Sequence, residues 1–209
     1  AVRSRGLGDV YKRQPLESLR FLLSICASHQ TSRKLADNHI IMVNDVKRAY
    51  FYAKATRPIY VEIPAEDREE GDESMAAMLN LSLYGTRDAA QNWADTYTGL
   101  LKSIGFTVGK ASPCNFHHKQ RDIALSVHGD DFTSSGPESS LRWLDAQLKG
   151  AYEIKTKFLG PDATRGHLSE VRVLNRVIRW TDDGITYEPD QRHVELIIAD
   201  LGLQDAKTV

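Results

Sequence analysis

The chain has 209 residues, of which 41% are hydrophobic, and a formal net charge of -1 at pH 7. This length allows one sizeable core or two small lobes that share one. The near-neutral charge argues against a simple nucleic-acid-binding module that depends on an overall basic surface. The two cysteines argue against a disulfide scaffold, and no apolar run approaches the roughly 18 residues of a membrane helix, so no membrane partner is expected.

The first residues, AVRSRGLGDVYKRQ, have no apolar pattern and include four basic side chains. We expect residues 1–14 to be a non-native or disordered leader, and the folded chain to begin at Pro15. The low cysteine content predicts a reducing intracellular environment and argues against secretion.

In chain order, helical periodicity predicts helices over 15–29, 87–104 and 137–150 and a last helix from Pro189. Trp93 and Tyr97 lie on the apolar face of the second of these helices. Short apolar or alternating runs predict strands over 39–43, 59–63, 116–118, 123–127, 152–158, 171–174, 177–180 and 185–187. The acidic stretch 66–73 is expected to be a solvated loop. This irregular mixture of elements predicts an α+β fold.

Three aspartates follow apolar runs of strand length. Asp45 comes after the run over 39–43, and Asp130 and Asp131 come after the run over 123–127. A strand end holds a carboxylate rigidly and leaves it open to a cleft, and carboxylate oxygens are the ligands that magnesium prefers. Aspartate pairs are also common in ordinary turns, as at Asp182 and Asp183, to which we assign no catalytic role.

Four segments in order carry a more specific signal. They read DVKRAYF from Asp45, SLYGTRDAAQNW from Ser82, HGDD from His128 and FLG from Phe158. They resemble the first palm motif, the SLYGLKQAPRAW segment, the YVDD motif and the FLG segment of copia-type retrotransposon reverse transcriptases. The stretch from Tyr187 is similar to the part that leads toward the connection region of that family. The resemblance covers residues 15–209.

The resemblance implies a right-hand polymerase palm, with an antiparallel sheet packed on helices, partial fingers and the start of the thumb or connection. The implied activity is that of an RNA-directed DNA polymerase, a nucleotidyltransferase that extends a primer 3′-hydroxyl with deoxynucleoside triphosphates on an RNA or DNA template. Other partners would be the remaining Pol polyprotein domains. The implied location is a cytoplasmic virus-like particle or the nucleus.

Two Mg²⁺ ions, replaceable by Mn²⁺, are the implied cofactors. By the resemblance, Asp45 and Asp130 bridge both ions and the backbone carbonyl of Val46 is a further ligand. Asp131 is a neighbouring catalytic carboxylate whose direct ligation stays open.

Five residues are implied to contact substrate: Tyr50, Tyr84, Gly85, Arg87 and His128. Tyr50 matches the aromatic gate that excludes a ribose 2′-hydroxyl, and its alternative is a core tyrosine on a short helix. Tyr84, Gly85 and Arg87 would lie against the incoming nucleotide and template, although a solvated arginine is the ordinary alternative. Lys155 and Lys157 fit equally well as primer or triphosphate contacts and as an exposed strand face.

His128 and Gly129 depart from the family pattern, since His128 replaces the usual tyrosine. Primer-end positioning is therefore in question, and a catalytically inactive remnant that still folds is the main alternative. A metal-dependent phosphohydrolase using the same aspartates is a further alternative, but it lacks a recognisable general base.

Overall fold

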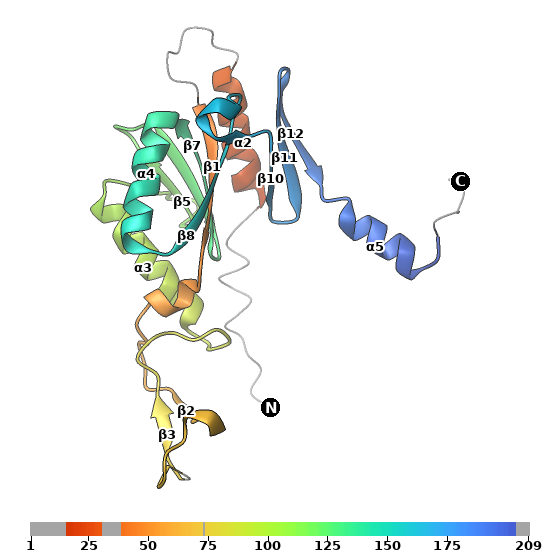
Figure 1. Cartoon of the computed structure of the whole chain (residues 1–209). Coiled ribbons are helices and arrows are strands. Elements are labelled where there is room, and N and C mark those ends of the chain that lie inside the picture. Colours follow the sequence, from red (N-terminus) through yellow and green to blue (C-terminus); the bar gives the residue numbers. More distant parts are fainter. Residues whose placement is uncertain (1–15, 31–38, 73, 204–209) are drawn as a thin grey trace.

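The computed structural model describes residues 16–30, 39–72 and 74–203, and the predicted leader lies outside them. A seven-stranded sheet with the order β4-β5-β6-β7-β1-β8-β9 forms the body (Figure 1). All neighbouring pairs in it are antiparallel except β8 and β9, which are parallel. Its strands are β1 (His39–Val46), β4 (Thr107–Val108), β5 (Asn115–His118), β6 (Ile123–His128), β7 (Asp131–Pro137), β8 (Ile154–Leu159) and β9 (His167–Leu168).

Helices cover both faces of this sheet. Helices α3 (Ala89–Ser103) and α4 (Glu138–Ala151) lie on one face, and α2 (Leu16–Gln30) lies on the other beside a three-stranded sheet (Figure 1). That smaller sheet consists of β10 (Glu170–Val173), β11 (Arg176–Thr181) and β12 (Gly184–Pro189). Strand β1 is central because both of its faces are apolar: Ile40 and Met42 pack with α3 and α4, and Ile41 and Val43 pack with α2.

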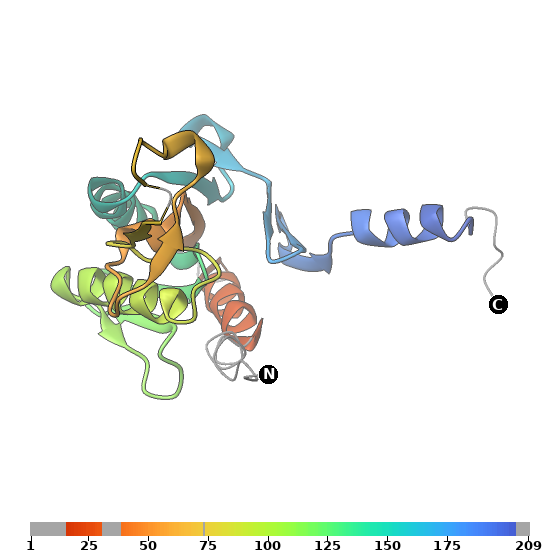
Figure 2. The same ribbon diagram turned by 90° about the horizontal axis from the view of Figure 1, so that it is seen from below.

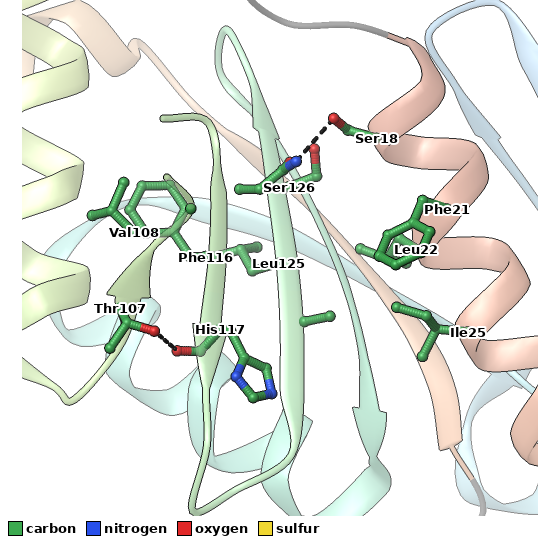
Figure 3. A pocket seen from close by; sticks show the side chains of 13 residues that line it. Ser18, Phe21, Leu22, Ile25, Thr107, Val108, Phe116, His117, Leu125 and Ser126 are labelled. Carbon is green, nitrogen blue, oxygen red and sulfur yellow. Dashed lines mark hydrogen bonds between the residues drawn. The ribbon is translucent and has the colours of Figure 1, made fainter. Parts of the chain in front are cut away.

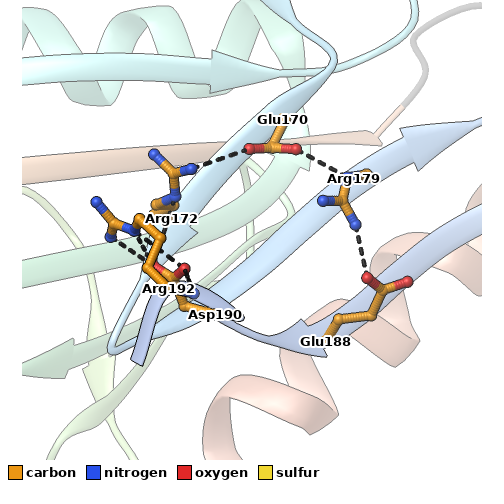
Figure 4. Close-up of polar contacts among 6 residues, drawn as sticks. All are labelled: Glu170, Arg172, Arg179, Glu188, Asp190 and Arg192. Carbon is orange, nitrogen blue, oxygen red and sulfur yellow. Dashed lines mark hydrogen bonds and ion pairs between the residues drawn. The ribbon is translucent and has the colours of Figure 1, made fainter. Parts of the chain in front are cut away.

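Two parts project from this body. The hairpin of β2 (Tyr60–Glu62) and β3 (Ala76–Met78) extends at one end, and α5 (Arg192–Asp200) extends beyond the smaller sheet (Figures 1 and 2). Asp190 anchors the start of α5, because its buried carboxylate pairs with Arg192 and with Arg172 of β10 (Figure 4). None of the helices within the described ranges is both long and apolar enough to span a membrane.

The structure confirms most of the predicted elements, but among the described residues β3, β4, β7 and β9 were not predicted, and the last helix begins later than expected. Strand β7 is not predicted by the sequence pattern, because its residues Thr133, Ser134 and Ser135 are small and polar, yet all three are buried in the centre of the sheet. The last helix begins at Arg192, because Pro189 instead ends β12. The mixed α+β fold with an antiparallel sheet packed on helices agrees with the predicted fold class.

Candidate active site at the ends of β1, β6 and β7

The three predicted carboxylates lie on neighbouring elements. Asp45 on β1 is directly opposite Asp131 on β7 in the antiparallel register. Asp130 occupies the two-residue turn between β6 and β7, and its backbone carbonyl accepts a hydrogen bond from the Val46 N–H at 3.2 Å. Opposite residues in an antiparallel pair present their side chains on the same face. The fold thus brings together Asp45, Val46, Asp130 and Asp131.

The Asp131 carboxyl titrates well above its ordinary pKa. Burial, and after it the negative charges of Asp130 and Asp45, together raise its pKa to about 6. A carboxylate whose neighbours oppose its ionisation is a group that a nearby cation would stabilise. Within the described residues, however, no group of three or more His, Cys, Asp or Glu side chains is arranged so that it could hold a metal ion.

The β6–β7 turn has a backbone that suits glycine. Gly129, its first residue, has a φ of 66°, which L-residues other than glycine adopt only with strain. His128 precedes it and pairs with Asp131 across the hairpin. Burial lowers the pKa of His128, and the charge of Asp130 opposes this change only in part, so the site favours the neutral imidazole.

The two predicted substrate tyrosines are in contact. Tyr50 is buried on the short 3-10 helix η1 (Ala49–Tyr52), and its ring centroid is 4.3 Å from that of Tyr84. Tyr84 itself is exposed and also contacts Phe51 edge-on. Tyr50 thus lies in the core on a short helix, as its alternative interpretation expects, and its ring packs against that of Tyr84.

Gly85 and Arg87 lie in the loop that follows Tyr84. Gly85 has a φ of 87°, and a Cβ built there would meet no other atom within 4 Å, so the backbone conformation alone favours glycine. The Arg87 side chain is exposed. Lys155, also exposed, is opposite Asp45 on β8, on the side of β1 away from Asp131.

Asn44 is a supporting residue that the sequence analysis missed. It is fully buried beside Asp45, and its Nδ2 donates to Thr156 Oγ1 on β8 at 3.0 Å. The Thr156 hydroxyl in turn donates to Asp145 of α4. These hydrogen bonds fix the end of β1. The only sign of them in the sequence was the polar residue Asn44 directly after the apolar run over 39–43.

Trp93 is the second missed residue. Its indole Nε1–H donates to the carbonyl oxygen of Gly129 at 2.9 Å, so helix α3 is attached to the turn that carries Asp130. From the sequence, Trp93 was recognisable only as part of an apolar helix face. Ser82, at the start of the same motif, is also buried and accepts a hydrogen bond from Asn92.

The FLG segment has a packing role in this structure. A Cβ at Gly160 would lie 2.6 Å from Nδ1 of the buried His167 and 2.9 Å from Ile40. Glycine is therefore required for β8 to end against His167, and the motif itself supplies no atom to the carboxylate group.

A separate apolar pocket of about 250 Å³ lies between α2 and the edge of the main sheet (Figure 3). Phe21 and Leu22 line it from α2, and Val108 and Leu125 line it from the strands. None of the three carboxylates is among its lining residues, so this pocket is distinct from the candidate active site.

Comparisons with known proteins agree with the motifs. The chain is 24% identical over 199 residues to the Retrovirus-related Pol polyprotein from transposon TNT 1-94 of Nicotiana tabacum, which covers 93% of this chain and 14% of that protein. It is 30% identical over 130 residues to the Transposon Ty1-MR1 Gag-Pol polyprotein of Saccharomyces cerevisiae, which covers 62% of this chain and 7% of that protein. The chain thus spans a small part of these relatives.

Among solved structures, the chain is similar to telomerase from Candida albicans in complex with a TWJ fragment of telomeric RNA. That likeness has a TM-score of 0.44 and 12% identity, and it covers 88% of this chain and 37% of the telomerase chain.

The family model described as reverse transcriptase (RNA-dependent DNA polymerase) matches residues 13–173. The transposon relatives confirm the resemblance to copia-type elements. The chain therefore belongs to the reverse transcriptase (RNA-dependent DNA polymerase) family.

Proposed function

We propose that this chain is the palm-containing part of an RNA-directed DNA polymerase that adds deoxynucleotides to a primer on an RNA or DNA template. The observation that carries this proposal is the pairing of Asp45 with Asp131, together with the hydrogen bond that ties Asp130 to Val46. Because these residues come from two distant parts of the chain, their meeting depends on the fold. Their order also matches the family motifs in which the proposed ligands occur.

The donor set fits divalent cations. Asp45 and Asp131 are opposite each other on paired strands and Asp130 directly precedes Asp131, and burial together with the charges of these two neighbours raises the pKa of Asp131 to about 6. Asp45, Asp130 and the Val46 carbonyl would hold the ions, and Asp131 would contribute negative charge beside them. When bound, two magnesium ions supply an activated primer hydroxyl and neutralise the leaving pyrophosphate. The chain's own part is to place these oxygen ligands on rigid strand ends.

Nucleotide selection would rest on Tyr50. Its ring is buried against Tyr84, so it has little freedom to move away from a ribose 2′-hydroxyl. Gly85 would allow close backbone approach to the nucleotide or template, and Arg87 would contact phosphate. His128, next to the turn, would lie beside the primer end as a neutral hydrogen-bonding group.

The proposed partners follow from this activity and from the relatives. They are an RNA template, a primer and template duplex, deoxynucleoside triphosphates and other parts of a Pol polyprotein, since two relatives are Pol polyproteins. Mg²⁺ is the proposed cofactor, with Mn²⁺ as its substitute.

Primer extension on poly(rA) primed with oligo(dT) tests the proposal. The 209-residue chain should incorporate dTTP with Mg²⁺ and not after chelation of the metal. Asp45→Asn and Asp130→Asn should each abolish incorporation, whereas Asp182→Asn, in the exposed turn between β11 and β12, should retain it. Equal extension by the parent and Asp45→Asn would refute the metal assignment. No extension by the folded parent would instead favour the inactive-remnant alternative.

A further inference from the structure

We propose that Trp93 is a positioning residue that holds Asp130 at the angle needed for metal binding. This inference rests on the proposed function, because it assumes that Asp130 is a ligand. Trp93 belongs to α3, and Asp130 belongs to the turn between β6 and β7, so the contact joins a helix to this turn of the main sheet.

The indole of Trp93 has a fixed orientation. The residue is 1% exposed, and its ring is surrounded by three aromatic rings that meet it at steep angles. The ring centroids of Tyr97, Tyr152 and Phe132 lie 5.4, 5.1 and 6.2 Å from it. Edge-to-face contacts of this kind are favourable and directional. They therefore determine where the single N–H of the indole points.

That N–H points to the backbone of the turn. Trp93 Nε1 donates to the Gly129 carbonyl oxygen at 2.9 Å, which is an ordinary length for a strong N–H to oxygen bond. The indole nitrogen can only donate a hydrogen bond, and leaving a buried donor without a partner costs about 1–3 kcal/mol of stability. Breaking this bond is therefore unfavourable, which keeps the turn in contact with the indole ring.

The two peptide groups on either side of Asp130 are both restrained. The Gly129 carbonyl belongs to the peptide that precedes Asp130, and Trp93 binds it. The Asp130 carbonyl belongs to the peptide that follows, and the Val46 N–H of β1 binds it at 3.2 Å. With both peptide planes fixed, the direction of the Asp130 side chain from its Cα is fixed as well.

This restraint matters because Asp130 lies in a two-residue turn next to a glycine. Gly129 has no side chain, and its φ of 66° lies in a region that glycine leaves easily. A misplacement of about 1 Å at a reacting group lowers rates by about 100-fold. Trp93 would thus act on the reaction without touching substrate, and removal of its N–H alone should lower catalysis.

Trp93→Phe tests this, because phenylalanine keeps an aromatic ring in the core and lacks the donor. We expect kcat for dTTP incorporation to fall by about 10- to 100-fold while the KM for dTTP changes by less than about threefold. In the metal-free protein, hydrogen exchange of the Val46 amide should accelerate by about tenfold or more, because the turn that accepts its hydrogen bond is loosened.

Trp143→Phe is the matched control. Trp143 lies on α4, half-buried against the same core, and its ring contacts His118 and Arg121, away from the turn. Trp143→Phe makes the same side-chain change at a half-buried position and should leave both kcat and the Val46 exchange rate near those of the parent. Parent-like kcat and Val46 exchange in folded Trp93→Phe would overturn the inference.

A second measurement avoids the variant altogether. In the unaltered protein, the indole N–H of Trp93 should exchange with solvent more slowly than free indole by a factor of about 1000 or more. Rapid exchange would overturn the inference even if Trp93→Phe failed to fold. Failure of the proposed function is distinguishable, because then the parent would not extend a primer while the exchange results would be unaffected.

Discussion

Asp45 of β1 and Asp131 of β7 face each other directly across an antiparallel ladder, and the next residue of β1, Val46, is hydrogen-bonded to Asp130. This relationship explains why the pKa of Asp131 is raised by burial and then by the charges of Asp130 and Asp45. Like charges oppose one another's ionisation, so a cation bound beside these carboxylates would relieve their repulsion. The metal site proposed for Asp45 and Asp130 rests on this relationship.

Tyr50 should control discrimination between deoxyribonucleotides and ribonucleotides. Replacement by valine removes the ring that Tyr84 holds in place, so a 2′-hydroxyl would no longer clash. In Tyr50→Val, kcat/KM for a ribonucleotide relative to its deoxynucleotide should rise by about 10- to 100-fold. Steady-state single-nucleotide incorporation measures this ratio. Tyr50→Phe keeps the ring and should remain as selective as the parent. If Tyr50→Val also remains as selective as the parent, the gate assignment is wrong.

Gly129 should be intolerant of the valine that the family motif carries. A Cβ at this position meets no atom within 4 Å, so the expected cost of a side chain there comes from the backbone strain at a φ of 66°. We expect Gly129→Val to lower the free energy of unfolding by about 1–2 kcal/mol, measured by urea denaturation.

Gly150→Ala provides the control for this change. Gly150 lies near the end of α4, has equally open space around its Cβ position and does not have a positive φ. Alanine there should be neutral or stabilising by about 0.5–1 kcal/mol. A Gly129→Val variant as stable as the parent would show that the turn adapts without strain.

Glu138 should make stability depend on pH. Burial favours the protonated form of this carboxyl, but hydrogen bonds from Arg142 and His167 outweigh that effect and hold its pKa below the ordinary value. The contribution to stability is therefore present above the ordinary pKa and is lost as the pH falls through the lowered one. Glu138→Gln should lose about 2 kcal/mol of unfolding free energy at pH 7, and less at pH 3.

Urea denaturation of the parent and of Glu138→Gln across this pH range measures the difference in unfolding free energy. Glu17→Gln, on the exposed side of α2, is the control, and it should change the unfolding free energy by no more than about 0.5 kcal/mol. A deficit of Glu138→Gln that stays constant from pH 7 to pH 3 would contradict the assigned direction of the pKa.

Hydrophobic patterning was sufficient for elements with a clear apolar period. Ile123, Leu125 and Val127 alternate and are buried on β6, and Trp93 and Tyr97 fall on the buried face of α3, as predicted. Strand β7 was not predicted because it is covered on both faces. The small polar side chains of Thr133, Ser134 and Ser135 fit this crowded position, where their hydroxyls can form hydrogen bonds. Ser134, for example, donates to the Met42 carbonyl. No period-2 signal remains in such a strand.

The sequence motifs located the carboxylates, but they did not provide the support around them. Asp45 and Asp130 were recognisable from motif order, whereas their proximity depends on β7 pairing with β1. The roles of Asn44 and Trp93 depend on contacts with Thr156 and Gly129, residues distant in the sequence. Such contacts have no local pattern, so a single sequence does not reveal them.

Binding of Mn²⁺, followed by electron paramagnetic resonance in the presence of a chain-terminated primer, poly(rA) and dTTP, tests the central claim most directly. We expect the parent and Asp182→Asn to bind the ion alike, and Asp45→Asn and Asp130→Asn to weaken its affinity by about tenfold or more. Superimposable titrations for all four proteins would contradict a metal site at the ends of β1 and β7.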